Sequence, residues 1–588
     1  MAIPVSSKLR KLLSLCLAIL ITLAASLPSA TPIRGQAGMV RRVNAPFFSP
    51  EMKYEEAAIF WFGRVTSTEN YADVRVGYTS ANLYVAITVF DRFMFTDPTP
   101  LPEDLANWDA VSLYLNRDGN TGATPSTSSY RLVGQVQASG GDSPNYRTSY
   151  HGTGSAWQAE AVPFSTISGS INEHGWSIFL RAPFASLGLS GPPAPGTIWG
   201  LALQLHDRDD AAGTAIPAKL WPENMTGMQP ATWGQLHFGL PTYTPPPSQP
   251  GGTVTIRQGL NGANVPDAGV GGTIGYLCPH WSTSLFNQWG NQNFAGAIGV
   301  NVQNQLNIAD WPCFSKYYLT FPLNIVPIGK AIQSATLTLH QWGGSDPTRA
   351  QPSLIQVLTV AEDWNENTIT WNNAPLALEN VSQAWVGVVD DCGAPGGTPW
   401  PCVPRQFDLS RAVAQAYADG IPLRLAIYEA DRTLHSGKFF TTSDEGNWNA
   451  VGRPTLTVVW GEAFPPLSKK PQPVAVDSGG SVTFTLQWSG NGQPLTLTDS
   501  LPEGFSAPVG LSYNLGSAEY SAGTRQITWN GAPAEAQLVT LSYSVTVQAS
   551  GPLALTNSAQ LSGDDGSSNA TATVIVDGFK SLLPLVSR

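Results

Sequence analysis

Apolar and polar side chains alternate along several short stretches of the chain. In the clearest one, residues 83–90, the apolar side chains fall on one face (Leu83, Val85, Ile87 and Val89). A shorter alternating run, 73–78, precedes it, and the polar segment 79–82 separates the two. A period of two is that of a β-strand, so the pair predicts a β-hairpin.

Comparable runs recur through the rest of the sequence. They predict strands at 110–115, 176–180, 199–205, 318–323, 331–340, 353–360, 425–429, 453–460, 481–488, 495–498, 527–529, 539–548 and 570–576. One helix is expected over 409–420, with Asp408 as its cap and Gly420 at its end. Many short strands joined by turns predict an all-β chain made of β-sandwiches.

Two proline-rich segments divide the strands into three groups. Residues 241–252 (PTYTPPPSQPGG) are expected to form an extended, semi-rigid linker, and residues 462–473 form a second one. The predicted domains are therefore 40–240, 253–461 and 474–578, followed by a C-terminal tail, 579–588. We expect three β-sandwiches joined by linkers.

The N-terminus has the pattern of a secretion signal. Lys8, Arg10 and Lys11 precede an apolar run, 12–23, that is too short to span a membrane. We expect a signal peptide over 1–30, with its end as late as residue 37, and a mature protein that is secreted or held at the cell surface. No other segment is long and apolar enough for a membrane span.

Composition narrows the classes of function. Only 12% of the 588 residues are charged and the net charge is −11, which disfavours nucleic acid because a phosphate backbone needs a basic face. The 57 glycines and 47 prolines suit turns rather than long helices. We expect a monomer.

Cysteine usage fits an exported protein. Outside the leader, four cysteines remain: Cys278, Cys313, Cys392 and Cys402. An even number predicts two disulfides with three possible connectivities, of which we favour Cys278–Cys313 and Cys392–Cys402. The spacing lacks the C-x-x-C pairs of a zinc site.

The first unit resembles carbohydrate-binding module family 9. The resemblance is carried by the hairpin 74–91, the segment 108–116 (WDAVSLYLN), the segment 160–165 and Trp199-Gly200. It implies a β-sandwich of a family in which some members hold the end of a glycan between two aromatic side chains.

The second unit resembles the DNRLRE domain, a family that overlaps carbohydrate-binding module family 96. Its matching segments are 332–339, the motif 364–375 (WNENTITWNNAP), 407–409, 440–445 and 453–456. The resemblance implies a jelly-roll-like sandwich attached to a secreted bacterial protein. The third unit resembles the Ig-like domain of unknown function 11 at 498–504 and 555–559, which implies a spacer.

Candidate binding residues follow from side-chain chemistry. Trp108 and Trp221 adjoin acids, prolines or turns, so we expect them to be exposed and able to stack on a sugar. Asn116, Asp118 and Asn120 place oxygens at alternate positions of a glycine-containing loop, which suits calcium, although a plain Asx-turn explains them too. Further acids group along the chain: Asp207 with Asp209 and Asp210, Glu362 with Asp363 and Glu366, and Asp267, Asp444 and Glu445 as a second calcium candidate.

These observations predict a secreted, non-catalytic protein that binds polysaccharide or cell-surface glycan, with calcium as a possible structural cofactor. One alternative is a structural or adhesive extracellular protein whose sandwiches are spacers. The other is a glycan-active hydrolase or lyase, which needs two carboxyls about 5–10 Å apart across a cleft. The sequence lacks the H-E-x-x-H, G-x-S-x-G and Walker motifs, which disfavours common catalytic classes.

Overall fold

The computed structural model describes residues 39–578, except 138, 173, 215, 247, 273–281, 283, 309, 346–349, 390–391, 394, 433–435 and 565. Strands make up 47% of the chain, which confirms the all-β prediction. The expected signal peptide and the tail 579–588 lie outside the described residues. In the described part, no helix is long and apolar enough to cross a membrane.

The first unit is a sandwich of two sheets. One has the order β2-β3-β4-β10-β9, and the other contains β1, β13, β11, β5, β6, β7 and β8, with β12 paired to β11. Their bounds are β1 (Arg42–Ala45), β2 (Ala58–Gly63), β3 (Tyr71–Tyr78), β4 (Asn82–Phe90), β5 (Ala110–Asn116), β6 (Ser129–Gln135), β7 (Arg147–Gly152), β8 (Trp157–Ala159), β9 (Ser165–Asn172), β10 (Gly175–Pro183), β11 (Ile198–His206), β12 (Lys219–Trp221) and β13 (Gly234–Phe238).

The second unit is also a two-sheet sandwich. One sheet has the order β15-β17-β22-β19-β20 and the other β14-β24-β18-β23-β16, with β21 paired to β18. Their bounds are β14 (Ser248–Arg257), β15 (Asp267–Gly271), β16 (Gly299–Val302), β17 (Ser315–Phe321), β18 (Lys330–Gly344), β19 (Ser353–Val360), β20 (Ala377–Val386), β21 (Val403–Asp408), β22 (Leu423–Glu429), β23 (Lys438–Thr441) and β24 (Thr455–Ala463). Two α-helices accompany them: α2 (Leu285–Gln288) and α3 (Ser410–Ala418), the latter at the position expected from the sequence.

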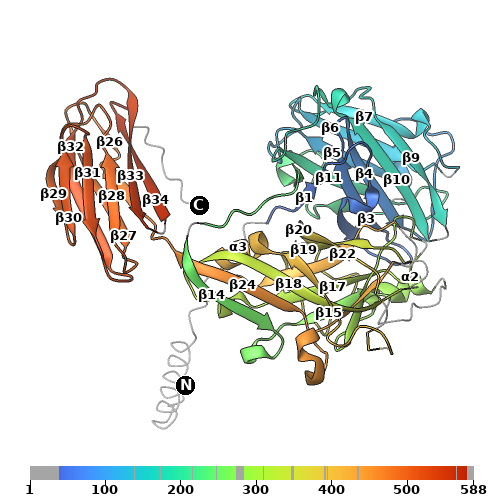
Figure 1. The fold of residues 1–588 in the computed structure, drawn as a ribbon. Coiled ribbons are helices and arrows are strands. Elements are labelled where there is room, and N and C mark those ends of the chain that lie inside the picture. The colour runs from blue at the N-terminus through green and yellow to red at the C-terminus, as the bar shows by residue number, and fades with distance from the viewer. Residues whose placement is uncertain are drawn as a thin grey trace, which may run out of the picture.

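The third unit stands apart from the other two (Figure 1) and has its own hydrophobic core. Its sheets have the orders β25-β27-β32-β29 and β26-β34-β33-β28-β31-β30. Their bounds are β25 (Ser468–Gln472), β26 (Ala475–Val476), β27 (Ser481–Ser489), β28 (Leu495–Ser500), β29 (Val509–Tyr513), β30 (Ser517–Ser521), β31 (Gln526–Gly531), β32 (Leu538–Thr546), β33 (Leu553–Gly563) and β34 (Gly566–Val576).

The first two units are fused, contrary to the expectation of sandwiches separated by linkers. Strand β1 pairs in parallel with β13 of the first unit and also in parallel with β20 of the second, so one sheet runs through both units. The Asn44 amide nitrogen donates to the Asn380 backbone carbonyl at 2.8 Å, and the Asn380 amide returns a bond to Asn44 at 3.0 Å. Figure 1 shows the first unit seated on the second. We refer to residues 39–463 as the two-unit block.

The segments expected as linkers are partly built into sheets. Strand β14 begins at Ser248, inside the expected linker 241–252, because its backbone pairs with β24 from Ala463 to Thr455. Strand β24 ends at Ala463 and β25 begins at Ser468, so only 464–467 connect the two-unit block to the third unit. Proline at a sheet edge is compatible with this pairing because its missing N–H need not bond.

Strand β3 explains why the two units pack so closely. All eight of its residues are buried, so both of its faces are covered. Val74 and Val76 belong to the hydrophobic core, while the opposite face meets the second unit. There the Arg75 guanidinium donates to the Ala430 carbonyl at 2.9 Å, and the Tyr428 hydroxyl donates to Asp73 at 2.9 Å.

Candidate functional site

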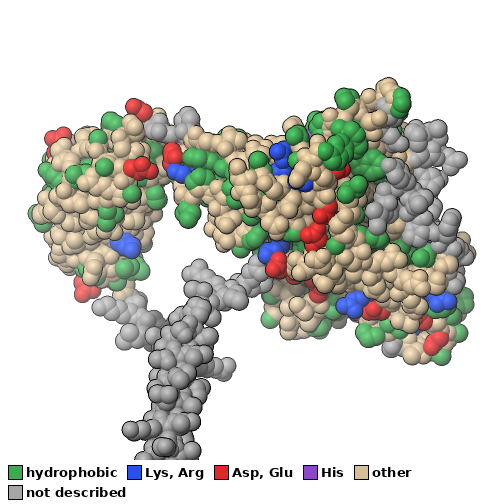
Figure 2. All heavy atoms as spheres, turned by 90° about the horizontal axis from the view of Figure 1, so that it is seen from below, with side chains coloured by type: hydrophobic (Ala, Val, Ile, Leu, Met, Phe, Trp, Pro, Cys, Tyr) green, Lys and Arg blue, Asp and Glu red, His purple; other side chains and the backbone are tan. Residues whose placement is uncertain are grey.

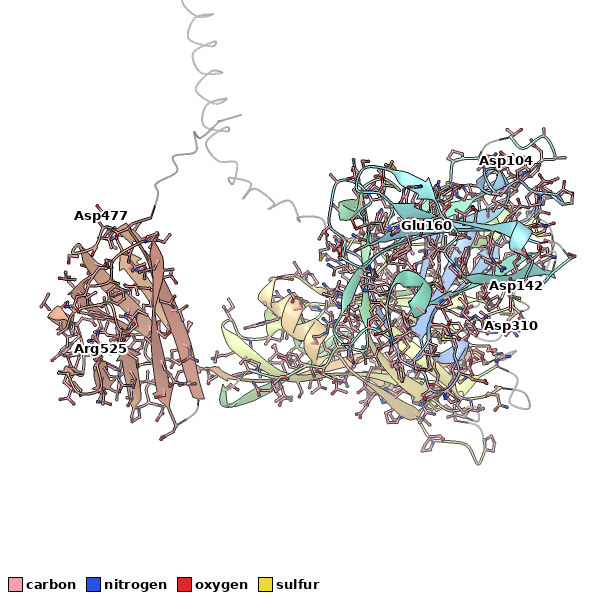
Figure 3. The ribbon with its side chains drawn as sticks, turned by 90° about the horizontal axis from the view of Figure 1, so that it is seen from above. Asp104, Asp142, Glu160, Asp310, Asp477 and Arg525 are labelled. Atoms are coloured by element: carbon pink, nitrogen blue, oxygen red, sulfur yellow. A yellow bond between two sulfur atoms is a disulfide. The ribbon has the colours of Figure 1, made fainter. Side chains whose placement is uncertain are left out.

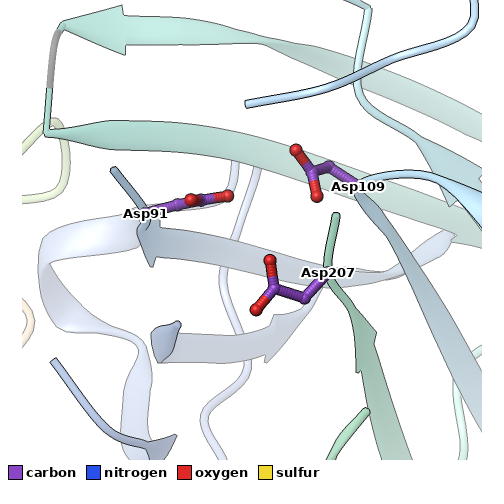
Figure 4. Close-up of side chains that lie close together, drawn as sticks. All are labelled: Asp91, Asp109 and Asp207. Atoms are coloured by element: carbon purple, nitrogen blue, oxygen red, sulfur yellow. The ribbon is translucent and has the colours of Figure 1, made fainter. Parts of the chain in front are cut away.

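Three carboxylates meet at one end of the first sandwich (Figure 4). Asp91 follows β4, Asp109 precedes β5 and Asp207 follows β11. Because β5 and β11 pair with Ala110 opposite His206, Asp109 and Asp207 are neighbours at the same sheet edge. Asp91 approaches from the facing sheet. One oxygen of each carboxylate lies within 4.8 Å of the others. We call these residues the aspartate triad.

The aspartate triad is closed to solvent, and its three carboxylates differ in the number of hydrogen bonds that they accept. Asp91, Asp109 and Asp207 are 4%, 0% and 1% exposed. Asp91 accepts from the Phe93 amide and the Trp176 indole, each at 2.9 Å. Asp109 accepts from two backbone amides at 2.6 and 2.8 Å. Neither oxygen of Asp207 has a hydrogen-bond donor among the described residues.

Burial and mutual repulsion change the protonation of the aspartate triad. Burial raises the pKa of Asp91 to about 7, against the opposing effect of its two hydrogen bonds. Burial, followed by the negative charge of Asp91, raises the pKa of Asp109 to about 9 and that of Asp207 to about 8. Such a group either holds protons or surrounds a cation. A set of carboxylate oxygens is the environment that hard cations such as Ca²⁺ prefer.

A second group of acids lies in the two-unit block, at Asp267, Glu366 and Asp444. Asp267 is 1% exposed, and burial raises its pKa to about 7. Its Oδ2 accepts from the Tyr317 hydroxyl and from the Ser443 amide, whereas its Oδ1 has no donor in the described structure. The sequence paired Asp267 with Asp444, as the structure does, but the third carboxylate is that of Glu366.

Glu445 is directed elsewhere: its carboxylate accepts from the Gly446 amide at 2.6 Å. The other acids noted in the sequence form local contacts or ion pairs. Glu362 pairs with Arg41 at 2.7 Å and Asp363 with Arg424 at 3.2 Å, while Asp210 accepts from the Thr214 amide.

The two tryptophans expected to stack on sugar differ in their surroundings. Trp108 is half-buried and adjoins Asp109 of the aspartate triad. Trp221 is only 1% exposed, and its ring centroid lies 4.2 Å from that of Phe60. The expectation that Trp221 is exposed was therefore wrong: β12 pairs with β11 and buries the indole in the core. Its ring has no face open to a ligand.

Asn116, Asp118 and Asn120 form a turn whose side chains bond within the protein. The Asn116 amide nitrogen donates to the Gly119 carbonyl at 2.8 Å, and its oxygen accepts from the Asp118 amide at 3.3 Å. Asn120 accepts from the Gln235 side chain at 2.9 Å. These bonds are those of an Asx-turn, which the sequence also allowed for this loop. Calcium binding at these three residues remains a prediction.

The cysteines follow the favoured pairing where the structure describes it. Cys392 and Cys402 are joined by a disulfide, with their Cα atoms 5.7 Å apart. Cys313 is also disulfide-bonded, while its expected partner Cys278 lies outside the described residues. The oxidised pair closes the loop between β20 and β21.

Sequence reasoning identified Asp207 within an acidic group but missed Asp91 and Asp109. The available signal was positional, because each of these acids borders an alternating run: Phe90-Asp91, Asp109-Ala110 and His206-Asp207. Acids at strand ends meet only where the strands pair or the sheets face each other, and local pattern does not give that pairing.

One segment of the chain matches the model of a known protein family. Residues 283–388 match the model of carbohydrate-binding module family 96, which confirms the resemblance of the second unit. This match covers α2 and the strands β16 to β20. No curated protein sequence matches the chain.

Several solved structures are similar to parts of the chain. A carbohydrate-binding module family 9 protein from Caldicellulosiruptor kristjanssonii, in complex with cellotriose, has a TM-score of 0.26 and 17% identity, covering 35% of this chain and 100% of its own. A putative carbohydrate-binding protein from Bacteroides uniformis has a TM-score of 0.26 and 9% identity, covering 34% and 99%. Likenesses at this level identify no ligand for this chain.

Proposed function

We propose that this protein is an exported, non-catalytic glycan-binding protein, and that the two-unit block presents its binding surface. The match of residues 283–388 to carbohydrate-binding module family 96 is the observation that carries this proposal. That segment lies within the two-unit block, where β20 is paired with β1 of the first unit. A glycan would therefore meet a rigid surface rather than a module on a flexible tether.

The chemistry of the surface supports a largely uncharged ligand. Only 12% of the chain is charged, and the net charge is −11. Figure 2 shows charged side chains in small groups, several with both signs, over the face that it presents, without a large basic patch. On the first unit, Asp142 is paired with Arg147 and Glu160 with His151 (Figure 3 labels the two acids).

Affinity gel electrophoresis of the mature chain tests this function. We expect at least one polysaccharide in the gel to slow its migration, because bound polymer retards the protein, while a non-binding reference protein runs unchanged. A panel should include cellulose derivatives, mannan, xylan and polyuronates. Unchanged migration in every gel would reject glycan binding and leave the spacer or adhesive alternative.

We propose in addition that the aspartate triad binds a structural Ca²⁺ ion. Asp207 carries this proposal, since its carboxylate is 1% exposed, lacks donors among the described residues and points at two other carboxylates (Figure 4). An unpaired buried charge costs several kcal/mol, and a divalent cation would offset that cost. The closed geometry gives the ion a role in holding β4, β5 and β11 together rather than in contacting a polymer.

Titration calorimetry with CaCl₂ on chelator-treated protein tests the ion. We expect Asp207→Asn to remove one bound equivalent, because the amide supplies a weaker ligand and a lower charge. Asp210→Asn is the matched control, since its carboxylate accepts locally from the Thr214 amide. An unchanged number of bound ions in Asp207→Asn would reject the assignment.

A further inference from the structure

Two tryptophans of the second unit form an exposed pair. Trp448 is 68% exposed and Trp400 is 39% exposed. Their ring centroids are 5.2 Å apart and the rings meet at 81°. They come from separate parts of the chain: Trp400 from the loop between β20 and β21, and Trp448 from the 3₁₀ segment Asn447–Gly452 that precedes β24. We call them the tryptophan pair.

The loop that carries Trp400 is constrained by a disulfide and by a backbone hydrogen bond to β18. The disulfide Cys392–Cys402 closes it, and the Cys392 amide donates to the Trp342 carbonyl at 2.7 Å. Gly393 lies under the indole: a Cβ atom there would fall 2.7 Å from the Trp400 Nε1, and the residue has φ 76°. Glycine at this position thus allows the ring to rest on the loop backbone.

The segment that carries Trp448 is fixed in a similar way. The Arg453 Nε donates to the Glu445 carbonyl at 2.8 Å, and its Nη2 donates to the Asn447 side chain at 3.0 Å. A Cβ atom on Gly446 would lie 2.8 Å from the Trp448 ring, so the indole lies close over this backbone as well. The anchoring holds the base of Trp448 in place, while most of the ring stays in water.

An immobilised, exposed indole pair favours a ligand with an apolar face. Aromatic rings contribute a large apolar area at low conformational cost, and they prefer such a face to a fully hydrated one. A pyranose ring has an apolar C–H face and a rim of hydroxyls, for which the exposed Asn447 beside Trp448 offers polar contacts. The net charge of −11 disfavours a polyanion.

We infer that the tryptophan pair is the contact site for a pyranose unit of a neutral polysaccharide. This inference rests on the proposed glycan binding and gives it a location. The sequence did not single out either residue, and both lie beyond the segment 283–388 that matches the family model. In the site, Trp448 stacks on the sugar face and Trp400 bounds it at a near right angle.

Affinity gel electrophoresis with variants of the full mature chain tests the site. In gels containing hydroxyethylcellulose, mannan or xylan, we expect Trp448→Ala and Trp400→Ala to weaken binding about tenfold, the effect of losing a buried aromatic contact. Trp448→Phe should retain part of the affinity, because it keeps an aromatic face. Trp385→Ala is the matched control, since Trp385 is 51% exposed but belongs to strand β20.

The outcomes separate the site from the function. Loss of retardation in the two pair variants, with Trp385→Ala unaffected, supports the inference. If the gel retards wild-type and Trp448→Ala proteins equally, the site is overturned while glycan binding stands. Loss of retardation in Trp385→Ala alone would have the same meaning. Retardation of wild-type protein only by a polyuronate would overturn the neutral ligand. A wild-type protein that no polysaccharide retards would reject the function together with the site.

Discussion

Without calcium, the midpoint of thermal unfolding is expected to fall as the pH rises from about 5 to about 9. The aspartate triad is responsible, because burial raises the pKa of Asp91, Asp109 and Asp207 to about 7, 9 and 8. The folded state then holds protons that the unfolded state, with ordinary aspartate pKa values, has released. Stability from these groups is complete below pH about 4 and is lost as the pH passes through the raised values.

Added calcium should reverse this trend. The ion competes with protons for the carboxylates, so the rise in unfolding midpoint should be small near pH 5 and larger near pH 8. The free energy of unfolding should gain about 2.7 kcal/mol where free calcium exceeds the dissociation constant about a hundredfold. Differential scanning calorimetry with CaCl₂ or with chelator measures both effects.

Asp207→Asn provides the decisive comparison for this prediction. It removes one of the three converging charges, so the pH dependence in chelator should flatten and the response to calcium should shrink. Asp210→Asn should follow the wild-type curves, because that carboxylate is only partly buried and is bonded locally. Equal midpoints with calcium and chelator near pH 8 would refute a calcium role for the aspartate triad.

The period-two patterns predicted the strands well, but they did not predict which strand faces contact water and which contact another unit. Leu83, Val85, Ile87 and Val89 are buried as the hairpin pattern requires. Tyr71, Asp73 and Arg75 alternate with apolar residues on β3, and such polar positions normally face water. In the protein they face the second unit, where Arg75 and Asp73 bond to Ala430 and Tyr428. Alternation shows which residues share a face, and it does not distinguish solvent from a neighbouring unit.

The candidate site was only partly predictable for a related reason. The pairing of Cys392 with Cys402 could be favoured from their closeness in sequence, and the structure confirms it. The aspartate triad instead depends on contacts between β4, β5 and β11, whose residues are far apart in the chain. Trp221 was misplaced because the neighbouring proline suggests an exposed turn, whereas the pairing of β12 with β11 buries it.

Asp73→Ala is expected to destabilise the two-unit block by about 3–5 kcal/mol, the cost of leaving a buried charge uncompensated. Asp73 is fully buried, and its carboxylate accepts hydrogen bonds from the hydroxyl groups of Tyr71 and Tyr428 at 2.7 and 2.9 Å. The Tyr71 hydroxyl in turn contacts the Lys316 ammonium at 2.5 Å. Lys316 thus reaches the first unit from β17 of the second, and Asp73 supplies the nearby negative charge.

The rings around Lys316 show why the acid is needed. Its ammonium lies 3.4 Å from the ring centroid of Trp371 and 4.3 Å from that of Trp61, within a cage completed by Tyr71 and Tyr428. Aromatic faces attract a cation but replace only part of its hydration. Burial accordingly lowers the pKa of Lys316 well below its usual value, and Asp73 opposes that shift.

Urea unfolding of three variants tests this buried contact, in which the Tyr71 hydroxyl links Asp73 to Lys316. Asp73→Ala should lower the midpoint strongly, whereas the double variant Asp73→Asn with Lys316→Met should lower it less, because the ammonium among the rings is removed together with the acid. Asp477→Ala, on the exposed surface of the third unit (Figure 3), should stay within about 0.5 kcal/mol of wild type. If Asp73→Ala unfolds at the same urea concentration as Asp477→Ala, the buried contact around Asp73 does not hold the units together. A large loss in Asp73→Ala that the double variant relieves would show that charge, rather than packing alone, makes the two sandwiches one body.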